Sequence, residues 1–194
     1  MIRRVLTLPK DRGLLRQRST RIKTFDATAL SLAEDLVDTW RDAGAYGLSG
    51  VQIGVMKRMM LFRDDDGEPV VVANPKVLTA RGDIKDYDGC LSLPGIFART
   101  RRPAEIELVG QRPDGSKYRE HLKDFVARIA LHELDHLEGI FFIDRLDSTD
   151  DLYTLESEKD ESGEETVREV PLSPSELHFV EKEIRPLPGF ALTV

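Results

Sequence analysis

The stretch Asp124-Phe-Val-Ala-Arg-Ile-Ala-Leu-His-Glu-Leu-Asp-His-Leu-Glu-Gly139 decides the fold. Its periodicity predicts a helix, because residues spaced by three and four positions lie on one helical face. Asp124 stands where a capping residue is expected, and Gly139 stands where a helix commonly ends. The shared face carries four side chains, at spacings of 4, 3 and 4: Phe125, Ile129, His132 and His136. This face is therefore apolar at one end and bears two imidazoles at the other.

Within this helix, His132-Glu133-Leu134-Asp135-His136 is an HExxH motif. Residues four apart lie about one helical turn apart, so both imidazoles can reach one metal ion. Glu133 is rotated by about 100° from His132, which places its carboxylate beside the metal, where it can accept a proton from water. A surface helix that carries two histidines by chance is the alternative. The imidazoles extend the apolar stripe, where unliganded His pairs are uncommon, and this favours the metal site.

Two histidines leave a tetrahedral catalytic metal one protein ligand short. Cys90 is the single cysteine of the chain, so no internal disulfide can form. It lies between Gly89, which allows a close backbone approach, and Pro94, which we expect to end a strand. A thiolate ligand would explain the cysteine, and a small buried apolar residue is the alternative. The candidates for the third ligand are Cys90, His121, His178 and a distant carboxylate.

The segments before this helix predict another helix and two hairpins. Asp26 or Thr28 is expected to cap an amphipathic helix that ends near Gly44. The glycine-rich segment 45–55 is unsuited to a helix. Two strand pairs are expected, 59–62 with 70–73, and 106–109 with 117–122, each joined by a polar turn. Phe141 to Ile143 is expected to form a short buried strand or turn. The fold class is therefore α+β, with antiparallel sheets around the central HExxH helix and an additional N-terminal helix.

The charge of the chain is concentrated in one segment. Between Asp147 and Val170, ten acidic and two basic residues give a local charge of −8, so the rest of the chain carries +1 of the total of −7. We expect a catalytic domain over 1–146, an acidic and flexible segment over 147–171, and a C-terminal segment over 172–194. In the last segment, Ser173 is expected to cap a short helix from Glu176 to Glu183, which Pro186 and Pro188 would end.

Composition excludes several classes of protein. The chain lacks an apolar run of about 18 residues, so no membrane span is expected. The basic N-terminus meets Pro9 and Lys10 before any apolar core of a signal peptide. We therefore expect a cytoplasmic protein, and an organelle protein whose transit peptide has been removed is the alternative. No basic stripe is interleaved with aromatic residues, so direct nucleic-acid binding is not expected.

Three segments, in this order, resemble the motifs GxGΦAAxQ, EGCLS and HExDH of the peptide deformylase family. They are Ala-Tyr-Gly-Leu-Ser-Gly-Val-Gln at 45–52, Asp-Gly-Cys-Leu-Ser at 88–92, and the HExxH segment at 132–136. HExxH alone is shared by many zinc peptidases. The two additional segments make the resemblance specific, and it covers roughly residues 3–146.

The resemblance implies an activity and assigns roles to residues. It implies a metal-dependent hydrolase that removes the N-terminal formyl group from the formylmethionine of new polypeptides and releases formate. Glu133 is expected to be the general acid and base, and Gln52 with the backbone N–H of Leu91 to form the oxyanion hole. The implied metal ligands are Cys90, His132 and His136.

The same resemblance implies the substrate contacts and the metal. Gly47 is expected to be the backbone edge along which the peptide lies as an added strand, and Ile129 to line the pocket for the methionine side chain. The family's native metal is Fe²⁺, with Ni²⁺ or Zn²⁺ able to substitute, and a thiolate with two imidazoles suits all three. The expected partners are N-formylmethionyl peptides, including nascent chains met transiently at the ribosome.

The sequence departs from the family pattern at four positions. Ala45 replaces a glycine of the first motif, and Ser49 and Gly50 replace its two alanines. Asp88 replaces the glutamate of the second motif, and Arg102 is the expected partner of its carboxylate. The acidic segment also stands where some members carry a basic helix linked to the ribosome, and acidic protein repels phosphate backbones.

Two other functions fit parts of the sequence. A zinc endopeptidase of the broader HExxH class would take its third ligand downstream of His136 and would not need Cys90. A deformylase-like protein could bind formylated or other peptides without turnover, and the altered first motif is the feature that favours it. The metal content after loss of Cys90 and the release of formate distinguish these functions from an active deformylase.

Overall fold

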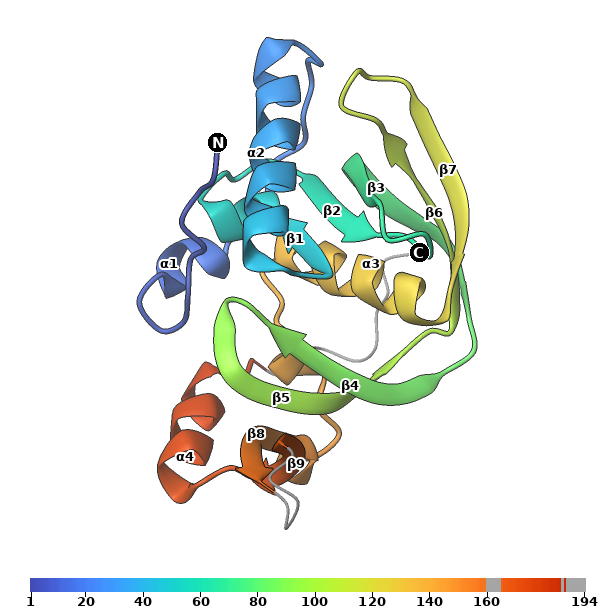
Figure 1. Cartoon of the computed structure of the whole chain (residues 1–194). Coiled ribbons are helices and arrows are strands. Elements are labelled where there is room, and N and C mark those ends of the chain that lie inside the picture. Colours follow the sequence, from blue (N-terminus) through green and yellow to red (C-terminus); the bar gives the residue numbers. More distant parts are fainter. Residues whose placement is uncertain (160–164, 186, 188–194) are drawn as a thin grey trace.

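The computed structural model describes residues 1–159, 165–185 and 187, and the predicted α+β class is confirmed (Figure 1). Two antiparallel sheets enclose helix α3 (Asp124–Leu137). In the first sheet the strand order is β1-β2-β3-β6-β7, and in the second it is β4-β5-β8-β9. The first sheet consists of β1 (Gly47–Ser49), β2 (Met59–Arg63), β3 (Pro69–Arg81), β6 (Glu105–Gln111) and β7 (Lys117–Lys123). The second consists of β4 (Ile84–Cys90), β5 (Leu93–Arg102), β8 (Leu152–Lys159) and β9 (Glu165–Pro171).

The N-terminal part of the chain packs on the first sheet. Helix α2 (Ala27–Ala43) begins as predicted at Asp26, whose carboxylate accepts from the backbone N–H of Thr28 at 2.9 Å. It ends at Gly44, which has a φ of 59°. A single helical turn, α1 (Arg12–Leu15), interrupts the irregular N-terminal arm, and the 3-10 helix η1 (Gly50–Ile53) follows β1. Both predicted hairpins, β2 with β3 and β6 with β7, are present.

Helix α3 is the buried centre of the molecule. Its apolar residues pack against β2, β3 and β6 in one core, which includes Val126, Ala130, Leu131, Phe62 and Leu108. The predicted cap at Asp124 is wrong, because Lys123 precedes the helix and Asp124 is already its first residue. Strand β7 runs directly into α3, so no loop residue is left to cap it. The positive φ of 46° at Asp124 turns the chain at this junction.

The β4–β5 hairpin was not predicted from the sequence. It closes at Cys90 and Leu93, so Pro94 lies inside β5 and does not end a strand there. The inward positions of β5 include Thr100 and Arg102, which are buried. Polar residues at inward positions conceal the alternation by which a half-buried strand is normally recognised.

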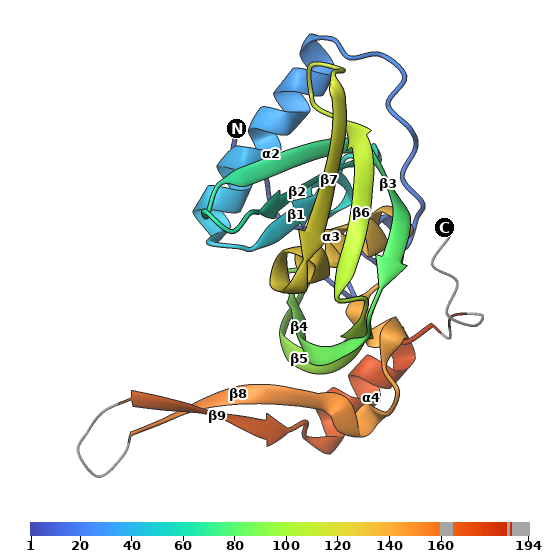
Figure 2. The ribbon, with the colours of Figure 1, turned by 90° about the vertical axis from the view of Figure 1, so that its right-hand side faces the viewer.

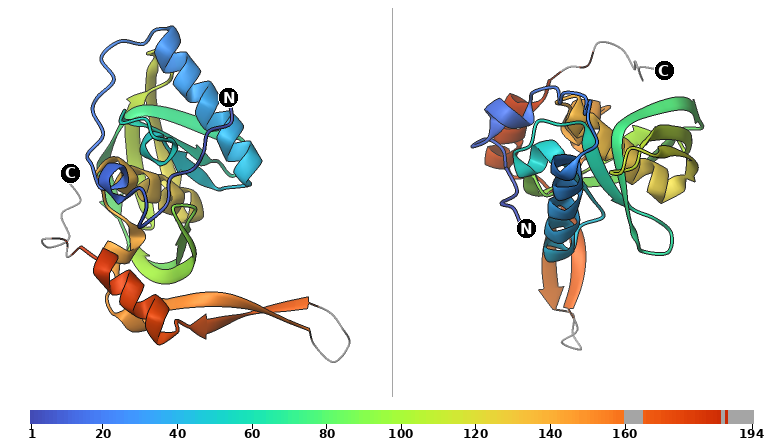
Figure 3. Two further views of the ribbon diagram at one scale, coloured as in Figure 1. Left: turned by 90° about the vertical axis from the view of Figure 1, so that its left-hand side faces the viewer. Right: turned by 90° about the horizontal axis from the view of Figure 1, so that it is seen from above.

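The acidic segment forms two paired strands over its described residues, and its expected flexibility stays a prediction. Strand β8 pairs with β9, and it also joins β5 through Phe97 opposite Tyr153 and Ala98 opposite Leu152. The β8–β9 hairpin extends away from the body of the molecule (Figure 2), and two other views agree (Figure 3). Short-range sequence patterns miss the pairing of β8 with β5, because the two strands lie about 55 residues apart in the chain.

The C-terminal helix returns to the body. Helix α4 (Pro174–Glu183) is capped by Ser173 as predicted, and its Val180 packs in a core with Leu15 and Phe141. Phe141 to Ile143 is buried as predicted, although η2 (Phe142–Arg145) makes it a 3-10 turn. The short η3 (Thr149–Asp151) then leads into β8. The expected helix stops at 186 and 188 lie outside the described residues, and the division into three segments stays a prediction.

None of the helices in the described part of the chain is long and apolar enough to cross a membrane.

Candidate active site

The predicted metal ligands converge although they come from two elements. Cys90 ends β4, and His132 and His136 lie one turn apart on α3. The Cys90 Sγ lies 3.2 Å from His136 Nε2, which lies 3.1 Å from His132 Nε2. Two donors that are each about 2.0–2.3 Å from one tetrahedral ion lie about 3–4 Å apart. The side chains therefore fit one shared metal ion.

The other candidate histidines lie elsewhere. His121 is exposed on β7, where its Nε2 lies 3.1 Å from Glu105 Oε2. His178 is exposed on α4. Of the candidates for the third ligand, Cys90 is thus the one that the fold brings to the HExxH pair.

A buried carboxylate orients the first histidine. Asp88 Oδ1 lies 2.6 Å from His132 Nδ1, and Asp88 Oδ2 accepts from Arg102 Nε at 2.9 Å. Burial disfavours the charge of Asp88, but Arg102 and His132 outweigh this effect and lower its pKa. The shorter side chain of Asp88 therefore still reaches the arginine expected as its partner, and it leaves His132 Nε2 directed at Cys90 and His136. A hydrogen bond of this kind fixes the tautomer of a metal-ligating histidine.

The network continues across α3. Arg102 Nη1 donates to Asp135 Oδ2 at 2.8 Å, and Asp135 also accepts from Arg145. The four side chains of this network are buried or nearly buried, namely Asp88, Arg102, Asp135 and Arg145. The motif residue Asp135 therefore links the support of His132 to η2.

Glu133 stands beside the metal ligands without a hydrogen bond to its Oε2 from the described residues. Burial is the main reason that its pKa is raised to about 7. A carboxyl group with a pKa near neutrality can both accept and release a proton. The orphaned oxygen and the perturbed pKa are typical of a catalytic group.

The glycines of the first motif allow close approaches. A Cβ at Gly47 would lie 2.5 Å from Glu133 Oε1 and 2.8 Å from Ile129 Cγ2. A Cβ at Gly50 would lie 2.9 Å from the carbonyl oxygen of Lys57. Strand β1 therefore passes so near α3 that only glycine fits at position 47. The departure from the family pattern at Gly50 has a different steric reason, the close carbonyl oxygen of Lys57.

The departure at Ser49 orients Gln52. The backbone N–H and the hydroxyl of Ser49 both donate to Gln52 Oε1, each at 2.9 Å. The amide nitrogen of Gln52 is thereby directed to the metal site, 3.6 Å from Cys90 Sγ and 3.2 Å from Ser92 Oγ. A hydrogen-bond donor is thus fixed beside the metal ligands.

These groups line one cleft of about 410 Å³. It brings together seven of the predicted site residues, namely Gly47, Gln52, Cys90, Leu91, Ile129, His132 and Glu133, while His136 lies behind them, fully buried. Sequence reasoning missed the aromatic residues Tyr46 and Tyr87, which contact Phe125, and it missed Arg128. Arg128 could have been found, because it precedes His132 by four positions on the same helical face.

Comparisons with known proteins agree with this geometry. The family model "Polypeptide deformylase" matches residues 2–151. The peptide deformylase of Agrobacterium fabrum is 38% identical over 138 residues, which are 69% of this chain and 81% of that protein. That of Dehalococcoides mccartyi is 33% identical over 155 residues, 79% of this chain and 92% of that one.

Solved structures give the same result. The crystal structure of a peptide deformylase from Legionella pneumophila has a TM-score of 0.71 and 32% identity, and the match covers 75% of this chain and 86% of that one. The enzyme from Thermotoga maritima has a TM-score of 0.72 and 30% identity, with 76% and 99% covered. The chain belongs to the polypeptide deformylase family.

Proposed function

We infer that this protein is a peptide deformylase, a metal-dependent hydrolase that removes the formyl group from N-terminal formylmethionine and releases formate. The family match over residues 2–151 supports this function. The observation that carries it is the convergence of Cys90, His132 and His136 beside a buried glutamate and an oriented amide.

One metal ion would be held by Cys90, His132 and His136. When bound, a divalent ion supplies a water nucleophile at neutral pH and polarises the carbonyl that is attacked. We propose Fe²⁺ as the native ion, with Ni²⁺ or Zn²⁺ able to replace it, because a thiolate with two imidazoles suits all three. The hydrogen bond from Asp88 would keep His132 in the tautomer that presents Nε2.

Glu133 would move the proton. Its carboxylate accepts a proton from the attacking water and then gives it to the amine that leaves. Its pKa, raised to about 7 by burial, suits both steps in this chain. Because Oε2 has no other partner among the described residues, it is available for the proton.

Gln52 and the backbone N–H of Leu91 would stabilise the negative charge on the formyl oxygen. We expect Gln52→Leu to lower kcat by about 100- to 1000-fold, the usual cost of one oxyanion-hole donor. The metal content should stay unchanged, because Gln52 is not one of the three ligands. Steady-state formate release from a formylated peptide measures the effect. A kcat within threefold of the wild type would remove Gln52 from this role.

The substrate would lie between β1 and α3. We propose that the peptide backbone pairs with the edge at Gly47 and that the methionine side chain enters the pocket lined by Ile129. Both residues line the cleft of the metal ligands.

Replacing Gly47 with alanine tests the proposed position of the substrate between β1 and α3. The added Cβ would displace Glu133 and Ile129, and misplacement by about 1 Å can cost about 100-fold in rate. We therefore expect kcat/KM for Gly47→Ala to fall by about that factor. Gly13→Ala is the matched control, because a Cβ there meets nothing within 4 Å. Equal rates for the two variants would contradict the close packing of β1 on Glu133.

Formate release from formyl-Met-Ala-Ser by protein loaded with Fe²⁺ or Ni²⁺ tests the function itself. We expect turnover that stops when the metal is removed and returns when it is restored. Binding of the peptide without formate release would instead establish the non-catalytic alternative.

The natural substrates would be formylated nascent chains, met transiently at the ribosome. The acidic β8–β9 hairpin argues against docking through RNA phosphates, since carboxylates and phosphates repel one another. The relatives include a chloroplastic protein of Oryza sativa, and a cytoplasmic location for this chain stays a prediction.

A further inference from the structure

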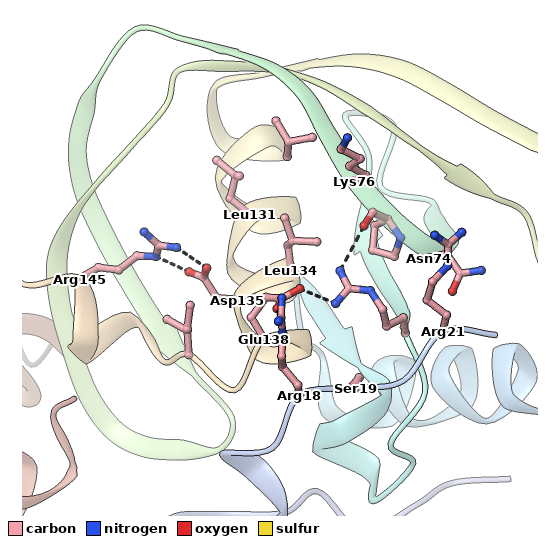
Figure 4. Close-up of a pocket in the computed structure, with 14 residues that line it drawn as sticks. Arg18, Ser19, Arg21, Asn74, Lys76, Leu131, Leu134, Asp135, Glu138 and Arg145 are labelled. Carbon is pink, nitrogen blue, oxygen red and sulfur yellow. Dashed lines mark hydrogen bonds and ion pairs between the residues drawn. The ribbon is translucent and has the colours of Figure 1, made fainter. Parts of the chain in front are cut away.

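A second cavity, of about 550 Å³, lies on another face of α3 (Figure 4). Its walls come from α3, from β3 and from the segment that contains Ser19 and Arg21. None of the three metal-binding side chains lines it, although Asp135 and Arg145 of the network that supports His132 do, and it shares no lining residue with the metal cleft. The proposed deformylase function therefore assigns no role to this cavity.

Hydrogen bonds hold the walls together. The backbone N–H of Ser19 donates to Leu137 O at 2.9 Å, which ties this segment to the end of α3. The backbone N–H of Ile22 donates to Asn74 Oδ1 at 2.9 Å, which ties it to β3. Arg21 and Lys76 are thus carried by two segments that are fixed beside each other. The cavity is built into the fold and does not depend on a loose loop.

The lining is strongly basic in a protein of net charge −7. Five cationic side chains and two carboxylates give the lining a formal charge of +3. Glu138 is shared by Arg18 and Arg58, and Asp135 by Arg102 and Arg145. The five cations of the lining are Arg18, Arg21, Arg58, Lys76 and Arg145. Each carboxylate of the lining is thus already paired with two cations, and the lining keeps an excess of positive charge.

Two cations of the lining have no ion-pair partner within residues 1–159, 165–185 and 187. They are Arg21 and Lys76, both exposed, and no dashed line reaches either of them in Figure 4. A guanidinium or ammonium group without a carboxylate partner is a donor of the kind that binds an oxyanion.

The remaining wall is apolar. Val77 comes from β3, and Leu131 and Leu134 come from α3. A concave surface with low-dielectric walls concentrates the field of the charges around it. Apolar side chains beside unpaired cations suit a ligand that has an organic part next to its negative charge.

We propose that this cavity binds a small organic phosphate. The phosphate groups pair with Arg21 and Lys76. The organic part lies against Val77, Leu131 and Leu134. The site is separate from the metal cleft, so binding does not depend on deformylase activity.

Calorimetric titration of the metal-loaded protein with ADP tests the proposal. We expect saturable binding that weakens as NaCl is raised, because salt screens exposed charges. The double variant Arg21→Ala/Lys76→Ala should bind at least about tenfold more weakly, since two charge-assisted contacts are lost. Its melting temperature without ligand should match the wild type, because neither side chain has an ion-pair partner among the described residues.

The control is Arg41→Ala/Lys117→Ala, which removes the same two charges from exposed positions outside the cavity. This variant should bind ADP like the wild type. Binding that persists in the Arg21/Lys76 variant, or that is lost equally in the control, would overturn the proposal, and so would a lack of binding to the wild type. Inorganic pyrophosphate should bind more weakly than ADP. Equal affinity would refute the part assigned to the apolar wall.

Discussion

Replacing Glu133 with glutamine is expected to lower kcat for formate release by about 100- to 10,000-fold, the range over which a general acid and base contributes. The amide has the shape of the carboxylic acid but cannot take up the proton of the attacking water. Glu133 Oε2 has no hydrogen-bond partner within the described residues, so the substitution breaks no hydrogen bond of that oxygen there. KM and metal content should therefore change little, and the loss should appear in kcat.

Steady-state kinetics with formyl-Met-Ala-Ser measure this loss, alongside metal analysis and thermal unfolding. Glu34→Gln is the matched control, because Glu34 is exposed on α2 and lies outside the cleft. Turnover that survives unchanged in Glu133→Gln, with the metal still bound, would show that the proposed proton transfer is wrong.

Replacing Cys90 with alanine is expected to remove both metal and activity. Mutation of groups that only support a ligand costs about 10- to 100-fold in metal affinity, so loss of a ligand should cost at least about 100-fold. Protein purified without added metal should then contain far less than one ion per chain. His121→Ala is the control, because this exposed histidine lies on β7, away from the site.

The same measurement separates the deformylase from the endopeptidase alternative. An HExxH endopeptidase that takes its third ligand downstream of His136 would keep its metal without the thiolate. Full metal content in Cys90→Ala would favour that alternative. A loss of metal in Cys90→Ala but not in His121→Ala would support the proposed ligand set.

Local physical signals were enough to predict much of the fold and the site. Asp26 and Gly44 mark the ends of α2 because capping and left-handed geometry demand particular residue types. His132 and His136 could be placed on one face of α3 because the helical period is fixed. Cys90 could be proposed as the third ligand because the fold family implied it, whereas spacing alone left four candidates.

What could not be predicted depends on partners distant in the sequence. The resemblance implied that Arg102 pairs with Asp88, but the hairpin that carries Arg102 inward, and its second contact with Asp135, appear only in the structure. The role of Ser49 likewise appears only when its two hydrogen bonds to Gln52 are known. Long-range pairings of this kind leave no periodic trace in the chain.

The pairing of β8 with β5 also determines which strand forms an exposed edge of the second sheet. Strand β5, which carries Phe97 of the cleft, pairs with β4 on one side and at Phe97 and Ala98 with β8 on the other, so β9 is the outer strand on that side of the sheet. Unpaired strand backbone invites strands of other molecules to add and aggregate, and charged side chains along it make such addition unfavourable. Glu165, Arg168 and Glu169 are exposed along β9. We therefore expect the charge of β9 to disfavour self-association of the protein at high concentration.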